Sequence, residues 1–282
     1  MTKIHYVDSQ AYLLRSAQSI PTTKLRHNGI NDANRMTITQ MTSVIILILL
    51  MACSPAKDDT AQFLNKYYYN IDRFAGPGEV YVYQSAGSTA LPEEIWHYRY
   101  DPGYKGNYLI STMYTPAGDV VQKTTERLDR DHAQLLSLDL YYLVDDSLHS
   151  IEAKVNSPRT FSFAAIDSLP MVNYEMEYYD LSSETDSVRV ILNKTRRVVG
   201  KELFYFEGVE IPAVRVVTRE VLETETEGFT ESEWTGIEIF AQDIGMVYYK
   251  KDINEQFTLE YTLAERISYS QFHNRYGANE LK

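Results

Sequence analysis

Cys53 is the only cysteine of the chain and so its only thiol nucleophile. It directly follows an unbroken apolar run, residues 44–52, and directly precedes a polar stretch. The small residue Ala52 stands before it, as at a signal-peptide cleavage site. An inert cysteine in a core strand is the alternative interpretation. A lone cysteine rarely falls by chance at the polar edge of an apolar run, so the position favours chemistry at this thiol.

The apolar run is about as long as the hydrophobic region of a secretory signal, roughly 7–15 residues. It falls short of the ~18 consecutive apolar residues that a membrane-spanning helix needs. We therefore expect residues 41–52 to be the hydrophobic region of a signal peptide and residues 53–60 to be a polar tether. Residues 1–40 fit a signal poorly, because a long polar stretch separates Met1 from the apolar run. We expect them to be an over-extended start or a disordered leader.

The sequence Leu50-Met51-Ala52-Cys53 resembles the lipobox of bacterial lipoproteins. The resemblance implies that the Cys53 sulfur receives a diacylglyceryl group, that the chain is cut before Cys53, and that the new amino terminus is acylated. Met51 departs from the small or branched residue more usual at that position. Two or more acyl chains hold a protein stably on a membrane. The resemblance thus implies a cell-envelope lipoprotein, anchored through Cys53 in the outer membrane on its periplasmic face or at the cell surface.

The other residues that could carry chemistry are dispersed. Four histidines follow the leader in unrelated contexts: His97, His132, His149 and His273. The segment Asp129-Arg130-Asp131-His132 is the one dense set of metal-ligand types, but acidic residues in turns usually hydrogen-bond their own backbone, and Arg130 would oppose a cation. No G-x-S-x-G motif is present. We expect no catalytic residue, no metal and no cofactor.

Composition excludes some partners and favours one fold class. The chain carries a formal net charge of −12, and such a surface repels phosphate backbones, so nucleic-acid binding is not expected. With a single cysteine, no disulfide can form within the chain. Tyrosine is abundant, at 23 residues, and tyrosine favours strands. These features indicate an acidic β-protein stabilised by its core.

Turn signals separate a series of short β-rich runs. The predicted strands are 79–83, 95–100, 108–114, 120–128, 135–144, 148–155, 171–180, 188–199, 203–206, 209–223, 229–240, 246–249 and 257–267. A short N-terminal helix is expected over residues 61–69 and a long loop over residues 156–170. No clear linker divides residues 61–282, so we expect one β-rich domain. The pattern favours a single antiparallel, strongly curved sheet or incomplete barrel, with a β-sandwich as the alternative.

Residues 234–247 resemble a stretch common in uncharacterised periplasmic lipoproteins, in which an aromatic strand leads through a glycine turn into a further strand. Those proteins are similar to the lipoprotein-carrier fold, an incomplete antiparallel barrel around an apolar cavity. The resemblance implies a bend at Gly245, with Ile244 and Val247 facing the interior. It also implies an open apolar groove for a lipid-like ligand or a surface for a partner, and it brings no catalytic residue.

The favoured function is therefore that of a membrane-anchored envelope lipoprotein that acts by non-catalytic binding or in envelope assembly. Its expected partners are the membrane, through lipid on Cys53, and a hydrophobic small molecule or an envelope protein. One alternative is a carrier or sensor of a lipid-like hydrophobic ligand. A second alternative is a hydrolase with an unrecognised site, which would need one of the four histidines to meet a carboxylate and a hydroxyl in a cleft.

Overall fold

The computed structural model describes residues 62–87, 90–104, 106–144, 147–180, 188–225 and 228–277. The leader, the apolar run, the tether and Cys53 lie outside the described residues. What the sequence predicts for them therefore stays a prediction.

Strands make up most of the described chain. They are β1 (Glu79–Ser85), β2 (Glu94–Gly103), β3 (Gly106–Tyr114), β4 (Val120–Leu128), β5 (His132–Val144), β6 (Ser147–Glu152), β7 (Lys154–Ser157), β8 (Arg159–Ser162), β9 (Met171–Asp180), β10 (Val188–Phe206), β11 (Val209–Glu225), β12 (Phe229–Ala241), β13 (Gly245–Asp252) and β14 (Thr258–Ser268). The helical elements are η1 (Leu64–Tyr67), η2 (Ile71–Phe74), η3 (Ile166–Ser168) and α2 (Tyr269–Tyr276). The short N-terminal helix is present as the 3-10 helix η1.

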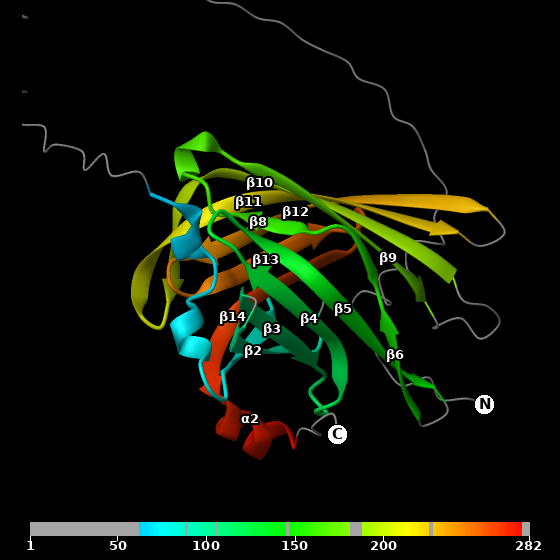
Figure 1. Ribbon diagram of the computed structural model, residues 1–282, viewed down its shortest axis with the longest axis horizontal. Coiled ribbons are helices and arrows are strands. Elements are labelled where there is room, and N and C mark those ends of the chain that lie inside the picture. The colour runs from blue at the N-terminus through cyan, green and yellow to red at the C-terminus, as the bar shows by residue number, and fades with distance from the viewer. Residues whose placement is uncertain are drawn as a thin grey trace, which may run out of the picture.

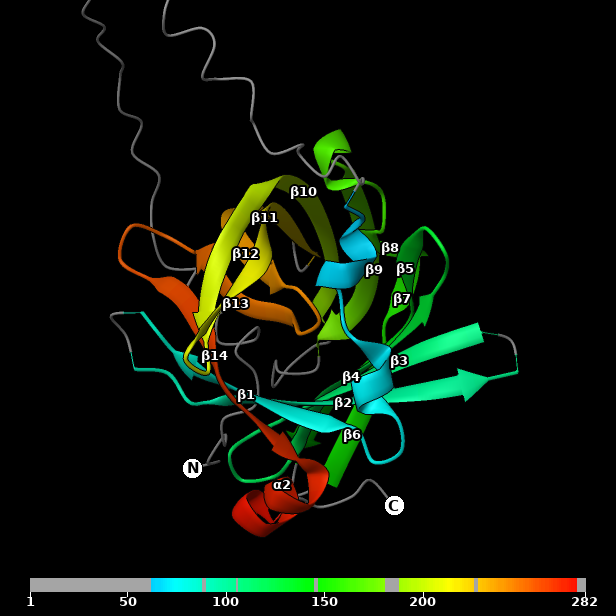
Figure 2. The same ribbon diagram turned by 90° about the vertical axis from the view of Figure 1, so that its left-hand side faces the viewer.

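The strands form one antiparallel sheet of fourteen members within the described residues. From β1 to β6, and again from β9 to β14, neighbours in the sheet are almost always neighbours in the sequence. The two halves join where β1 pairs with β14, with Glu79 opposite Ser268. Figure 1 and Figure 2 show this sheet curling around an interior.

The segment from β6 to β8 brings the two outer edges of the sheet together. β6 pairs with β5 at one edge, whereas β7, which begins after the single residue Ala153, pairs with β9 at the other. β8 then returns to pair with β5. The expected loop over residues 156–170 thus contains a strand, because β5 has a free edge there. The outcome is a nearly closed barrel, which confirms the predicted incomplete barrel in place of two packed sheets.

The two longest strands, β10 and β11, have 19 and 17 residues. The predicted runs 188–199 and 203–206 are parts of the single strand β10. Its pairing with β11 shifts register between Val198 and Gly200. A glycine in a strand often marks such a bulge. The β-rich sequence pattern is interrupted near Gly200, but β10 continues through this position as one strand.

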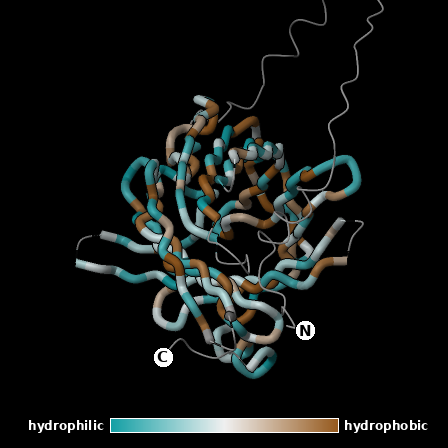
Figure 3. The backbone as a smooth tube through the Cα atoms, turned by 90° about the vertical axis from the view of Figure 1, so that its right-hand side faces the viewer, coloured by the Kyte–Doolittle hydropathy of each residue, from teal (hydrophilic) through white to brown (hydrophobic). Residues whose placement is uncertain are grey.

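Buried tyrosines cover part of the barrel's inner surface. Tyr81 and Tyr83 alternate with valines along β1, so the two residue types face opposite sides of the sheet. Tyr81 donates its hydroxyl hydrogen bond to the carbonyl oxygen of Ile244 at 3.0 Å, and Tyr83 donates to that of Met246 at 2.7 Å. Figure 3 shows hydrophobic and hydrophilic residues interspersed along the chain. Each ring therefore adds apolar area while its hydroxyl stays paired.

The turn between β12 and β13 has the geometry that the lipoprotein resemblance implies. Gly245 has φ of 100°, and Ile244 and Val247 are 4% and 0% exposed. A Cβ atom at Gly245 would lie 2.3 Å from Cδ1 of Tyr69. Both the backbone conformation and the neighbouring ring thus require glycine.

The C-terminal helix α2 was not predicted from the sequence. Ser268 accepts a hydrogen bond from the backbone N–H of Gln271, whose side chain accepts one from the backbone of Ser268. This capping box starts the helix, and Gly277, with φ of 61°, ends it. Phe272 is fully buried in a cluster with Val80 of β1. The helix therefore covers the face of β1 opposite to the tyrosines.

Candidate binding site inside the barrel

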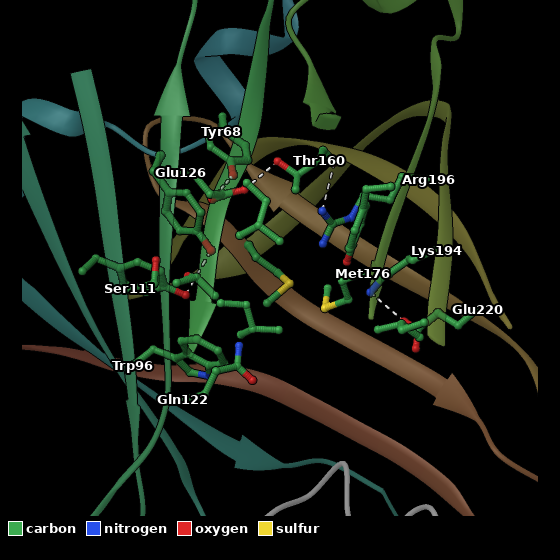
Figure 4. Close-up of a pocket in the computed structure, with 18 of the residues that line it drawn as sticks. Tyr68, Trp96, Ser111, Gln122, Glu126, Thr160, Met176, Lys194, Arg196 and Glu220 are labelled. Carbon is green, nitrogen blue, oxygen red and sulfur yellow. Dashed lines mark hydrogen bonds and ion pairs between the residues drawn. The ribbon is translucent and has the colours of Figure 1, made fainter. Parts of the chain in front are cut away.

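The barrel interior contains a cavity of about 170 Å³. Its wall is formed by β2 to β5 on one side and by β9 to β13 on the other, with Thr160 of β8 and two tyrosines of the N-terminal segment between them. Figure 4 shows Gln122 and Trp96 on one side of the cavity and Lys194, Arg196 and Glu220 on the other. The two sides differ in chemistry.

One side is a chain of alternating buried charges. Glu220 accepts from Lys194 at 2.7 Å and also contacts Lys251. Glu238 accepts from Lys194 at 2.8 Å and from Nε of Arg196 at 2.7 Å. The two carboxylate side chains are 4% and 5% exposed. Four neighbouring strands, β10 to β13, place these five residues on the inner face of the barrel.

The cations keep both carboxylates ionised. Burial alone would raise the pKa of Glu220, but Lys194 and Lys251 outweigh it and lower this pKa to about 2. For Glu238 burial acts the same way, and Arg196 with Lys194 lowers the pKa to about 2. Burial disfavours the charged form of Lys194, yet the two carboxylates raise its pKa above the usual value. The network is therefore charged throughout the physiological range.

Acid is expected to destabilise the protein through this network. An unfolded glutamate has a pKa of about 4.3, whereas the folded values for Glu220 and Glu238 are about 2. A depressed folded-state pKa gives stabilisation that is complete above the unfolded value and is lost as the pH falls through the folded value. The free energy of unfolding should thus drop between about pH 4.3 and pH 2, and Glu220→Gln should make that drop shallower. Urea unfolding at several pH values measures this, and parallel curves for the two proteins would contradict it.

A second polar group links the N-terminal segment to the cavity wall. Tyr68 donates to Oε2 of Glu126 at 2.7 Å, and Thr160 donates to Oε1 at 2.5 Å. Arg196 donates to the carbonyl oxygen of Thr160 at 3.0 Å. Burial, followed by the charge of Glu126, raises the pKa of Tyr68 well above its usual value. Glu126 is thus connected to the charged side through a single residue.

Apart from Glu126, the opposite side of the cavity is uncharged. Along β4 the alternation of side chains brings Gln122 and Thr124 to the inner face together with Glu126, and all three line the cavity. Ser111 of β3 lies directly opposite Thr124 in the register. The neighbouring inward side chains of β5 are leucines, of which Leu138 is one. This side therefore combines uncharged polar groups with apolar surface.

Aromatic rings cover one end of the cavity. The hydroxyl of Tyr69 donates to that of Tyr98 at 3.0 Å, and the centroids of the two rings are 4.6 Å apart. Trp96 stacks on Tyr98 at 6.3 Å. Burial raises the pKa of both tyrosines, so they remain neutral. The same Tyr69 ring is the one that excludes a side chain at Gly245.

The four histidines lie away from this cavity, and none of them lines it in the part of the chain that the structure describes. His97 is bonded to the carbonyl oxygen of Pro77 at 2.7 Å and stacks on Tyr269 at 4.4 Å. Burial lowers the pKa of His97. His149 is exposed, and His273 packs edge-on against Tyr269.

The acidic segment before β5 is held by its own neighbours. His132 contacts Oδ1 of Asp131 at 2.7 Å. Asp129 accepts from Nε of Arg127 at 3.1 Å and from the side chain of Gln134 at 3.0 Å. These contacts occupy both carboxylates. Among residues 62–277, leaving aside the undescribed gaps, no group of three His, Cys, Asp or Glu is arranged to hold a metal ion.

The charged side of the cavity was missed in the sequence, although a signal was present. In β10 the inward phase runs through Val190 and Leu192 and continues to Lys194 and Arg196. In β11 and β12 the same phase reaches Glu220 and Glu238. Charged residues in the inward phase of three successive strands would have indicated a buried network.

No helix in the described part of the chain has the length and apolar character needed to span a membrane. No protein-family model matches the sequence. No curated protein matches it either.

Solved structures of similar fold come from bacteria. One is a proposed exported protein with a YmcC-like fold from Bacteroides fragilis NCTC 9343, with a TM-score of 0.46 and 13% identity over 71% of this chain and 98% of that chain. Another is a proposed lipoprotein from Parabacteroides distasonis ATCC 8503, with a TM-score of 0.44 and 11% identity over 70% of this chain and 95% of that one. The hypothetical lipoprotein YmcC of Escherichia coli K12 has a TM-score of 0.31 and 8% identity over 68% and 87%. The terms exported protein and lipoprotein describe those three proteins.

Proposed function

We propose that the chain is a bacterial envelope lipoprotein, anchored in the outer membrane through Cys53, whose barrel binds a small molecule without catalysing a reaction. The location is inferred from the lipobox-like sequence that ends at Cys53. The binding role is inferred from the interior cavity, whose wall combines apolar, aromatic and neutral polar side chains with four charged ones. Binding pockets commonly have this composition, with a few polar groups that orient the ligand.

The size of the cavity restricts the ligand. A cavity of about 150 Å³ in another protein binds benzene, and drug-sized ligands occupy roughly 300–1,000 Å³. The interior here measures about 170 Å³. The ligand is therefore comparable to one substituted ring or a short chain. A lipid with several acyl chains does not fit, which narrows the lipid-carrier alternative to small hydrophobic molecules.

The buried carboxylates favour binding over catalysis. A general acid or base works best when its pKa lies near the operating pH. Glu220 and Glu238 have pKa values of about 2, and each is held by two cations. They stay ionised and paired at neutral pH, so neither supplies or accepts a proton. These two carboxylates thus support a role of the cavity in binding rather than in proton transfer.

Native mass spectrometry of the lipoprotein isolated from its own membranes tests the binding role. We expect a population carrying one small-molecule adduct that is released when the protein is unfolded. A clean mass of the apo-lipoprotein, under conditions that preserve a known complex measured alongside, would contradict the proposal.

Membrane attachment is expected to depend on Cys53 alone. Each buried methylene contributes about 0.8 kcal/mol to anchoring, so loss of all acyl chains removes the anchor. Cys53→Ala should move the protein out of the membrane fraction and abolish labelling with a palmitate analogue, whereas Ser54→Ala should change neither. Fractionation and labelling measure both effects. Undiminished membrane retention of the Cys53→Ala protein would end the lipidation hypothesis.

A further inference from the structure

The charges that line the cavity balance one another. They are two cations, Lys194 and Arg196, and two carboxylates, Glu126 and Glu220. Behind them, Glu238 and Lys251 add one further charge of each sign. These six groups sum to zero charge, and the hydroxyls of Tyr68 and Thr160 occupy the two oxygens of Glu126.

A charged ligand would disturb this balance. An anion could bind Lys194 only in competition with Glu220 and Glu238, which lie 2.7 and 2.8 Å from its Nζ atom. The displaced carboxylate would remain buried without its partner, and an uncompensated buried charge is strongly unfavourable. A cation would meet the same obstacle at Glu220 and Glu238, and at Glu126 it would have to displace the hydroxyls of Tyr68 and Thr160 from both carboxylate oxygens. The charged side of the cavity therefore disfavours ligands of either sign.

The neutral side, in contrast, has free hydrogen-bonding capacity. Ser111, Gln122 and Thr124 line the cavity. Within the described residues, the structure shows no hydrogen-bond partner for any of these three side chains. Ser111 is only 4% exposed. A buried hydroxyl or amide without a hydrogen-bond partner carries a desolvation penalty, and a partner atom on a ligand removes that penalty. A ligand with one neutral donor or acceptor supplies that partner.

Apolar side chains flank these polar groups. Leu138 and Leu140 extend from β5, Trp96 lies beside Gln122, and Met176 faces them across the cavity (Figure 4). Methionine is flexible and polarizable and adapts to irregular apolar shapes. This part of the wall fits the apolar body of a small ligand.

We propose that the cavity binds an uncharged amphiphile, an alcohol or primary amide on a single ring or short chain, whose polar end is held by Gln122, Thr124 and Ser111. The inference rests on the proposed binding function and adds the chemical class of the ligand. It excludes fatty acids, amines and phospholipid headgroups as ligands of this cavity.

A series of probes with one ring and different polar ends tests this assignment: benzyl alcohol, benzoate, benzylammonium and toluene. The full-length lipoprotein is titrated with each probe in phosphatidylcholine nanodiscs by calorimetry, and protein-free nanodiscs correct for partition into lipid. Benzyl alcohol should bind at least about tenfold more tightly than either ion, because a charged end gains no partner and disturbs the network. Tighter binding of benzoate or benzylammonium would overturn the ligand class and leave the binding function standing. The absence of binding by all four probes would overturn both.

Variants separate the polar contacts from the apolar ones. Gln122→Met with Thr124→Val removes two neutral hydrogen-bonding groups at nearly constant volume. Loss of two hydrogen bonds should weaken benzyl alcohol binding by about tenfold and leave toluene binding unchanged. Thr125→Val, on the other face of β4, should affect neither probe. Equal weakening of both probes by the double variant would overturn the assigned contacts. The probe series on the unmodified chain decides the ligand class even if the double variant does not fold.

Discussion

Glu238→Gln is expected to lower the free energy of unfolding by about 3–5 kcal/mol, the range typical of removing one member of a buried ion pair. The substitution keeps the shape of the side chain and removes its charge. Lys194 and Arg196 contact the two oxygens of Glu238. After the substitution, both cations would stay buried with one negative charge fewer beside them. Urea unfolding followed by circular dichroism measures the loss.

The control for Glu238→Gln is Glu233→Gln. Glu233 pairs with Arg219, but its side chain is 44% exposed, and exposed ion pairs contribute only about 0–1 kcal/mol. The two substitutions are chemically identical and lie five positions apart on β12. Comparable losses of unfolding free energy from both substitutions would contradict the large effect that we expect from the burial of Glu238.

Gly245→Ala is the second substitution with a large expected effect, a loss of about 2–6 kcal/mol. The backbone at φ of 100° strains any residue with a Cβ atom by about 1–3 kcal/mol. The new methyl group also meets Cδ1 of Tyr69 at 2.3 Å, and overpacking a core costs about 1–3 kcal/mol more. Thermal and urea unfolding both report the result.

Gly208→Ala separates the two contributions. Gly208 has φ of 83°, and a Cβ atom there meets nothing within 4 Å, so only backbone strain applies. The difference between the two substitutions measures the contact with Tyr69. Combining Gly245→Ala with Tyr69→Ala should cost less than the sum of the single changes, because the small side chain removes the clash. Equal losses for Gly245→Ala and Gly208→Ala would contradict the steric part of the explanation.

The sequence was sufficient to predict the fold class because its signals are local. Turn signals such as Pro116-Ala117-Gly118-Asp119, which lies between β3 and β4, and abundant tyrosine mark strands whatever the tertiary arrangement. Helix α2 escaped because eight residues are too few for a helical period, although Ser268 and Gln271 had the spacing of a capping box. β8 escaped because a four-residue strand forms only where β5 offers an edge.

The binding site could not be predicted, because it depends on which strands face one another. Glu220 and Glu238 are two of 39 acidic residues, and their phase along β11 and β12 distinguishes them from surface acids only once the buried face of each strand is known. Only the register of β10 with β11 places Glu220 opposite Lys194. The neutral side likewise requires the pairing that sets Ser111 against Thr124.

The pairing of β1 with β14 also governs when the chain can fold. Glu79 of β1 and Ser268 of β14 are partners in the register. The first strand of the barrel therefore cannot complete its pairing until the last strand is available. Contacts between such distant positions must overcome a large loop-closure entropy, and proteins dominated by them fold in milliseconds to seconds. A chain arrested before residue 258 lacks β14 altogether and leaves one edge of β1 without its partner. The barrel can therefore be completed only once residues 258–268 are available to pair with β1.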